Sequence, residues 1–307
     1  MIPTQKIIIL FFISILVIFG VYAIVPKNSL KTQNNKLQVT TSFYPLYFFA
    51  SQIGGTKAEV NNITPSGAEP HDYEPTAQDM VRIEQSKLLI LNGGKLEAWG
   101  DKIKENLNGT GVVIITAGNG IANQQVIEDG KSILDPHVWL SPPLAKVEVK
   151  AILNGFIQVD PRNKQYYINN TNNLLSQLDE LDGEYKQGLV DCNQKNIITS
   201  HAAFGYLGKS YRLNQVPISG LSPDAEPSVK QLAEVTQFAK AHDVKYIFFE
   251  SLVSPKLADT IAIEVGAKTL VLDPIEGVSG ENMKAGKNYL TIMKDNLSNL
   301  RLALECK

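Results

Sequence analysis

Three of the four histidines in this 307-residue chain lie where a folded protein could gather them around a metal ion. His71 and His137 each follow a proline in a short turn, and His201 lies at the end of an apolar run. The fourth, His242, ends an amphipathic helical stretch, where a surface histidine that interacts with the helix dipole is the simpler interpretation. A single loop histidine is usually only a polar surface group. Three together favour a transition-metal site, because imidazole suits zinc, copper, nickel and iron.

A tetrahedral site needs a fourth ligand, and two carboxylates end apolar runs further along the chain. Glu250 follows residues 246–249, and Asp273 follows residues 269–272. Either carboxylate could instead cap a helix, which for Glu250 is a serious alternative. Pro274 stiffens the turn after Asp273 and would hold that carboxylate outward. We therefore expect Asp273 to be the fourth ligand, and Glu250 to orient an imidazole N–H from behind the ligands.

The elements that would position these residues alternate between short, nearly all-apolar runs and longer helical stretches. Runs of this kind suit parallel strands that are buried on both faces. Strands are expected at residues 37–43, 60–64, 88–92, 112–116, 196–200, 216–219, 246–250 and 269–273. Helices are expected at residues 47–53, 77–85, 228–241 and 255–265. The alternation predicts an α/β fold with parallel sheets.

One long helical stretch separates the two sets of strands. It begins with Asp160 as N-cap and Pro161 at the first helical position, where a missing N–H costs nothing. The sequence thus predicts two lobes, each with a parallel β-sheet flanked by helices, at residues 37–159 and 191–307, joined by one long rigid linker helix at 160–190. In open α/β sheets ligands bind at the carboxyl ends of the strands. Facing lobes would therefore bring His71 and His137 from the first lobe to His201 of the second.

Seven motifs follow one another from Leu37 onward and carry a family resemblance. They are TSFYPL at 41–46, EPHDYEP at 69–75, DPHVWLSP at 135–142, SHAAFGY at 200–206, GLSPDAEPS at 220–228, FFE at 248–250 and LDPIEG at 272–277. Together they resemble the zinc/manganese ABC-transporter substrate-binding family, whose members are also called metal-binding adhesin lipoproteins. The resemblance implies two α/β lobes, a rigid linking helix and a metal buried between the lobes. On the matching positions its ligands are His71, His137, His201 and Asp273.

The resemblance implies zinc as the transported ligand, with manganese as the alternative. Manganese-type members tend to place a carboxylate at the third position, where this chain has His201, and a third nitrogen ligand leans towards zinc. Many zinc-type members carry a histidine-rich loop before the second metal histidine, but residues 117–134 contain no histidine. That departure keeps manganese open.

The expected function is therefore that of an extracytoplasmic binding protein, not an enzyme. It would capture one divalent metal ion and deliver it, as a monomer, to an ABC transporter permease in the membrane. The alternative is a zinc-dependent hydrolase with a three-histidine open metal site, in which Asp273 does not bind and Glu250 is the general base. No H-E-x-x-H sequence occurs to support a metalloprotease helix. Nucleic acid is excluded as a partner, because no basic run occurs and the net charge is −2.

Residues 1–26 predict export of everything that follows. Lys6 precedes a long apolar stretch at 7–25, which is either a signal peptide or a membrane anchor. Residues 27–36 are polar and predict a tether. Many relatives are lipid-anchored through a cysteine, but no cysteine lies in this part of the chain. We therefore expect a protein tethered to the cell membrane or secreted to the periplasm.

The two cysteines, Cys192 and Cys306, leave two alternatives open. An even number of cysteines outside the cytosol permits a disulfide bond. Two unpaired thiols are equally compatible with the sequence. Neither cysteine lies near a histidine in sequence, so a cysteine-rich zinc site is not expected.

Overall fold

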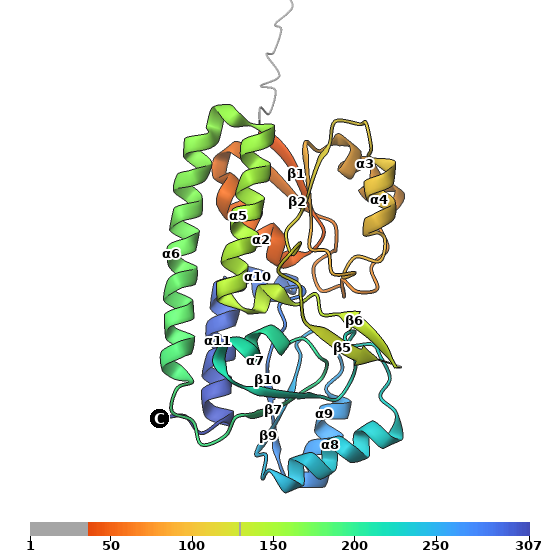
Figure 1. The fold of residues 1–307 in the computed structure, drawn as a ribbon, viewed down its shortest axis with the longest axis vertical. Coiled ribbons are helices and arrows are strands. Elements are labelled where there is room, and N and C mark those ends of the chain that lie inside the picture. The colour runs from red at the N-terminus through yellow and green to blue at the C-terminus, as the bar shows by residue number, and fades with distance from the viewer. Residues whose placement is uncertain (1–35, 129) are drawn as a thin grey trace, which may run out of the picture. The chain divides into compact units, whose positions relative to one another are not determined.

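The computed structural model describes residues 36–128 and 130–307 (Figure 1). The segment expected to be a signal peptide or membrane anchor, 1–26, and nearly all of the expected tether lie outside the described residues. Within those residues, no helix combines the length and the apolar character that crossing a bilayer requires.

The first lobe is built on a four-stranded parallel sheet in the order β2-β1-β3-β4. Its strands are β1 Leu37–Thr41, β2 Ala58–Asn62, β3 Leu88–Leu91 and β4 Val113–Thr116. Its helices are α2 Tyr44–Gly54, η1 Gly55–Lys57, α3 Ala77–Gln85, α4 Gly100–Asn106, η2 Val138–Leu140 and α5 Pro142–Val159. Alternate residues of β3 face opposite layers: Leu88 and Ile90 pack in the core with α2 and α5, and Leu89 and Leu91 with α3 and α4. Burial on both faces explains the unbroken apolar run.

The second lobe repeats this design with a parallel sheet in the order β10-β9-β7-β8. Its strands are β7 Asn196–Thr199, β8 Asn214–Pro217, β9 Tyr246–Phe249 and β10 Lys268–Val271. Its helices are α7 Gly205–Tyr211, α8 Val229–Ala241, α9 Lys256–Val265, α10 Gly280–Lys284 and α11 Tyr289–Ala303. Ile198 and Ile247 pack with α8 and α9, whereas Ile197 and Phe248 face α7 and α11.

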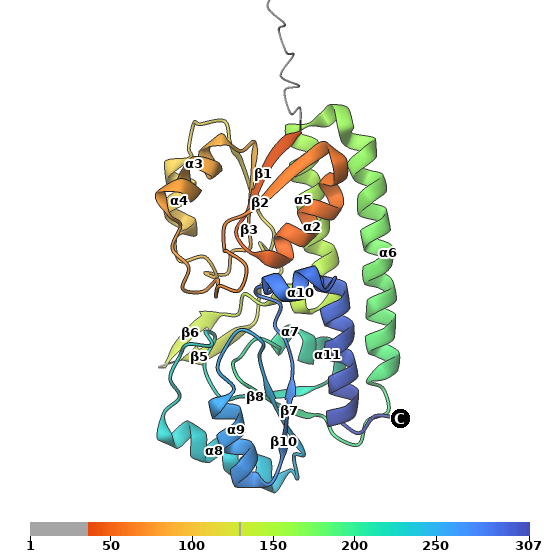
Figure 2. The same ribbon diagram turned by 180° about the vertical axis from the view of Figure 1, so that it is seen from behind.

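A long helix on one side of the molecule links the lobes (Figures 1 and 2). It consists of a short turn, η3 Pro161–Asn163, followed by α6 Lys164–Gly188, and it packs against α2, α5 and α11. Its buried face belongs to a core cluster that includes residues of both lobes. Tyr289 of α11 also donates a hydrogen bond of 2.5 Å to the carbonyl of Trp139 in the first lobe. Opening the lobes widely would expose this shared core, so the helix acts as a spine.

The α/β class, the two parallel sheets and the linking helix are thus confirmed. All eight expected strands occur, each within two residues of its expected bounds. Asp160 is the N-cap and Pro161 the first residue of η3, as expected, but the Asp160 carboxylate makes no cap bond and instead accepts hydrogen bonds from Asn163 and Tyr167 at 2.6 and 2.7 Å. The antiparallel hairpin of β5 Gln125–Glu128 and β6 Lys131–Leu134 was not expected, and it lies just before His137.

The two cysteines form a disulfide bond between Cys192 and Cys306. The bond ties the segment after α6 to the end of the chain after α11, across a sequence separation of 114 residues. In the chain-entropy model, closing a loop of this size stabilises the fold by roughly 4–5 kcal/mol. The bridge therefore locks the base of the second lobe to the spine.

Candidate metal centre

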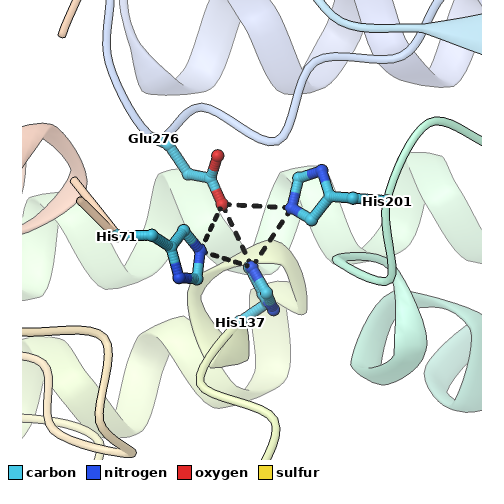
Figure 3. Close-up of side chains that lie close together, drawn as sticks. All are labelled: His71, His137, His201 and Glu276. Carbon is cyan, nitrogen blue, oxygen red and sulfur yellow. Dashed lines mark hydrogen bonds and ion pairs between the residues drawn. The ribbon is translucent and has the colours of Figure 1, made fainter. Parts of the chain in front are cut away.

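Four side chains converge between the two lobes: His71, His137, His201 and Glu276 (Figure 3). His71 lies in the loop after β2 and His137 directly before η2, so the first lobe supplies two of them. His201 follows β7 and Glu276 follows β10, in the second lobe. The three histidines that the sequence singled out therefore do come together. The carboxylate that joins them is Glu276.

The spacing of the four ligand atoms fits a tetrahedral ion. His71 Nε2 lies 3.3 Å from His137 Nε2, and His201 Nε2 lies 3.4 Å from the same atom. Glu276 Oε1 lies 3.2, 3.0 and 3.3 Å from the Nε2 atoms of His71, His137 and His201. Zinc bonds of about 2.0–2.1 Å at tetrahedral angles place neighbouring ligand atoms about 3.3–3.4 Å apart. All four atoms lie within 4.8 Å of one another.

Two of the imidazoles are oriented by carboxylates behind them. Asp135 Oδ1 lies 2.8 Å from His137 Nδ1, and Glu250 Oε1 lies 2.6 Å from His201 Nδ1. Each contact holds a proton on Nδ1, which leaves the Nε2 lone pair free to bind a cation. The same oxygens accept hydrogen bonds from the backbone N–H of His137 at 2.9 Å and of His201 at 3.2 Å. Ring and backbone are therefore fixed together.

His71 is held differently and is the most accessible member of the group. Its side chain is 9% exposed, whereas those of the other three are 0–2% exposed. Its backbone N–H donates to Glu69 Oε1 at 3.2 Å. Burial, together with the nearby charge of Glu276, raises the pKa of the Glu69 carboxyl to about 9. Glu69 therefore supports the backbone of His71 from a buried position.

The supporting acids Glu69 and Asp135 were not expected, although the sequence holds a signal for them. Both occur in the pattern acid-Pro-His, at residues 69–71 and 135–137. In each case the carboxylate accepts the backbone N–H of the histidine two residues later. A short acidic side chain that folds back onto the chain in this way is a turn-forming device. The repeated pattern therefore identifies both turns.

The carboxylates dominate the electrostatics of the site. Burial alone would lower the pKa of His201, but the charges of Glu250 and Glu276 outweigh it and raise this pKa well above its ordinary value. The pKa of His137 is likewise raised, because hydrogen bonds with Asp135 and Glu276 outweigh burial. Burial would raise the pKa of Glu276, but His201 and the hydrogen bonds with the histidines hold it well below its usual range. The arrangement stabilises positive charge at its centre.

We expect metal affinity to fall steeply as the pH drops. A metal ion must displace the protons held on the raised imidazoles, so each proton released makes the apparent Kd rise tenfold per pH unit below the pKa. Because the pKa of His201 is raised well above its ordinary value, this residue alone predicts a loss on the order of tenfold per pH unit below that pKa. Titration calorimetry in two buffers of different ionisation enthalpy would measure the released protons. A Kd independent of pH would contradict the arrangement.

The metal-free fold should show the opposite dependence. A histidine whose pKa is raised in the folded state stabilises the fold at low pH, and this contribution is lost as the pH rises through the folded pKa. As the pH falls through the mildly acidic range, the stability of the metal-free protein should therefore rise. The stability of the metal-loaded protein should fall, because the metal is lost.

Asp273 does not join the four-residue group, which corrects the expected fourth ligand. Its carboxylate accepts hydrogen bonds from the Ser251 hydroxyl and from the backbone N–H of Ile275, the latter at 2.7 Å. Burial raises the pKa of Asp273 to about 6. Glu250, by contrast, lies behind an imidazole, in the place expected for it.

The Asp273 carboxylate instead shapes the turn that presents Glu276. Ile275 adopts a φ of 59°, a left-handed conformation that is rare for a β-branched residue and is found mainly at functional sites. The Asp273 carboxylate holds the N–H of this residue, and the Trp139 indole N–H donates to the carbonyl of Pro274 at 2.7 Å. These two bonds turn the chain so that the next side chain, Glu276, points at the histidines.

Comparison with known proteins gives a consistent result. The family model "Zinc-uptake complex component A periplasmic" (ZnuA) matches residues 39–303. The high-affinity zinc uptake system protein ZnuA of Bacillus subtilis is 41% identical over 292 residues, which cover 92% of each chain. The zinc-binding protein AdcA of Streptococcus pyogenes is 34% identical over 97% of this chain, which spans only 61% of the length of that relative.

The solved structure of the Zn(II)-bound ZnuA-like domain of Streptococcus pneumoniae AdcA is also similar. It superimposes with a TM-score of 0.77 at 38% identity, covering 88% of this chain and 99% of that domain. Fold, family model and relatives therefore agree. The chain belongs to the family of periplasmic zinc-uptake components: it is an extracytoplasmic solute-binding protein whose partner is a membrane permease, and it is not an enzyme.

Proposed function

We propose that this protein binds one zinc ion through His71, His137, His201 and Glu276 and delivers it as a monomer to the permease of an ABC importer. The observation that carries the proposal is the clustering of the four ligand atoms, five pairs of which lie 3.0–3.4 Å apart. Three imidazoles with one carboxylate favour zinc over manganese, because manganese prefers oxygen ligands. The names of the relatives, a zinc uptake protein and a zinc-binding protein, support the same ion.

The arrangement disfavours the hydrolase alternative. A catalytic zinc keeps one coordination position for water, and here a fourth side chain closes the tetrahedron. The general base considered for a hydrolase was Glu250, but its carboxylate contacts Nδ1 of His201, on the side of the ring away from the ligand cluster. Glu250 therefore cannot reach a water molecule bound to the ion. Enclosure between two lobes suits capture of an ion rather than turnover.

We further propose that residues 1–26 export the protein and either anchor it or are removed, with residues 27–36 as the tether. The lobes would then comprise residues 37–159 and 191–307, with 160–190 as the linker.

The net charge of −2 and the buried acids suit collection of cations from dilute solution.

Competition between the two candidate metals tests the proposed function. The full-length protein, purified in mild detergent and stripped with chelator, would be offered equimolar zinc and manganese and then assayed by elemental analysis. We expect one zinc ion per chain and no retained manganese. Retention of manganese in place of zinc would change the assigned ion, and retention of neither would refute the proposed site.

A further inference from the structure

A tyrosine of the second lobe forms hydrogen bonds with the backbone of the first lobe beside the site. The Tyr206 hydroxyl accepts hydrogen bonds from the backbone N–H groups of Asn123 and Gln124, at 2.8 and 3.0 Å. It donates to the backbone carbonyl of Asp135 at 3.0 Å. Tyr206 is only 2% exposed. Its single hydroxyl therefore provides hydrogen bonds to three backbone groups at a place that water does not readily reach.

These three backbone groups bracket the β5–β6 hairpin. Asn123 and Gln124 come directly before β5 Gln125–Glu128, and Asp135 comes directly after β6 Lys131–Leu134. The backbone N–H of Asp135 also donates to the carbonyl of Gln124 at 2.9 Å. The hydroxyl therefore closes the base of the hairpin at the point where the chain enters the His137 turn.

The contact leads directly to a member of the metal centre. Asp135, whose carbonyl receives the hydroxyl proton, holds both the ring Nδ1 and the backbone N–H of His137 through its carboxylate. On the other side, α7 Gly205–Tyr211 begins four residues after His201. The short segment from His201 to Tyr206 thus carries one histidine of the centre and fixes the turn that carries another.

The two lobes approach each other closely at this point, where the second lobe has a glycine. A Cβ atom added at Gly205 would lie 2.8 Å from Asp135 Oδ2 and 3.4 Å from Gln124 Oε1. Such a contact is closer than real Cβ atoms adopt, so a side chain there would push the Asp135 carboxylate away. The glycine allows the helix to begin against the His137 turn.

We infer that Tyr206 is a positioning residue for zinc binding: through Asp135 it sets the placement of His137 relative to His201. The inference rests on the proposed zinc site. Loss of the hydroxyl leaves two N–H groups and one carbonyl without their partner. The His137 turn then shifts against the second lobe, and the ligand atoms leave their tetrahedral spacing. Residues that support metal ligands in this way typically change metal affinity by about 10- to 100-fold.

The test compares two tyrosines of the same helix. Tyr206→Phe removes the hydroxyl that reaches the His137 turn. Tyr211→Phe is the matched control, because the Tyr211 hydroxyl donates at 3.0 Å to Asp182 on the linker helix, away from the site. Zinc Kd and the zinc release rate to a chelator would be measured on full-length proteins in detergent, together with the Tm of each metal-free form.

We expect Tyr206→Phe to raise the zinc Kd by about 10- to 100-fold and to speed release, and Tyr211→Phe to leave both within about threefold. If both substitutions lower the metal-free Tm while zinc affinity is unchanged, Tyr206 has only a structural role and the inference is wrong. Should Tyr206→Phe fail to fold, Gly205→Ala decides instead, since it displaces Asp135 with the hydroxyl intact. We expect the same loss of affinity in that variant, and wild-type affinity there would overturn the inference.

A double-variant cycle tests the route through Asp135. If Tyr206 acts on His137 through Asp135, then Tyr206→Phe should weaken zinc binding less in an Asp135→Asn background than in the wild type. If the fold-changes in zinc affinity caused by the two substitutions simply multiply in the double variant, this route is contradicted. Failure of the wild-type protein to bind zinc would refute the proposed function itself, and is thereby distinguishable from failure of the inference.

Discussion

Replacing Glu276 by alanine should weaken zinc binding by roughly 10²- to 10³-fold, whereas replacing Asp273 by asparagine should leave it within about threefold. Zinc sites with four protein ligands have binding free energies of about 10–16 kcal/mol, or about 2.5–4 kcal/mol per ligand, and each 1.4 kcal/mol is a factor of ten. Glu276 Oε1 lies within 3.3 Å of all three imidazole Nε2 atoms, so its removal opens the centre.

Asp273→Asn is the matched control for this prediction. Asparagine keeps the volume of the side chain and the oxygen that accepts the N–H of Ile275, so the turn that presents Glu276 is retained. Affinities would be measured by competition with a chelator of known zinc affinity. The reverse result, with zinc lost in Asp273→Asn and kept in Glu276→Ala, would restore the fourth ligand expected from the sequence.

Replacing His201 by alanine should have the larger effect, at least on the order of 10³-fold in zinc affinity. The substitution removes a ligand, deprives the buried Glu250 carboxylate of its imidazole partner, and takes one of three imidazoles from Glu276. A buried charge left without a partner is strongly unfavourable, so the site will rearrange or take up protons. Elemental analysis after dialysis should find no zinc in this variant.

His242→Ala provides the control for the loss of a histidine as such. His242 is the exposed C-cap of α8, and its ring packs against Phe238 with ring centroids 4.2 Å apart. This variant should keep one zinc per chain. Zinc lost equally from both variants would mean that histidine content matters, rather than the geometry of the centre.

The parallel strands could be predicted from the sequence because they are buried on both faces. The apolar runs that form β3 and β9 have no competing helical period, and their bounds followed directly. Helix α3 begins after Thr76, whose side chain forms a capping box with Asp79, and its expected bounds match those of the structure. Helices α5 and α11 were missed, although their buried residues form much of the core that joins the lobes.

The histidines could be predicted because their residue type and their turns carry the signal. The fourth ligand could not, because Asp273 and Glu276 lie in the same short turn. Which of the two carboxylates points at the histidines depends on the left-handed conformation of Ile275. That conformation is held by Trp139, which comes from the other lobe and is distant in sequence. Local propensity argues against a β-branched residue there, so tertiary contacts decide.

The disulfide bond and the Tyr206 contact could not be predicted, because each joins residues that only the folded structure brings together. The disulfide between Cys192 and Cys306 requires α11 to return alongside the linker helix. The Tyr206 contact requires the two lobes to meet at Gly205. Both depend on tertiary packing rather than on any local pattern.

A crystal structure of the zinc-loaded protein with anomalous scattering at the zinc edge tests the central claim most directly. We expect one zinc peak per chain, bonded to Nε2 of His71, His137 and His201 and to the carboxylate of Glu276, at about 2.0–2.1 Å. Water or Asp273 in the fourth position, or zinc bound elsewhere, would contradict the closed four-ligand site.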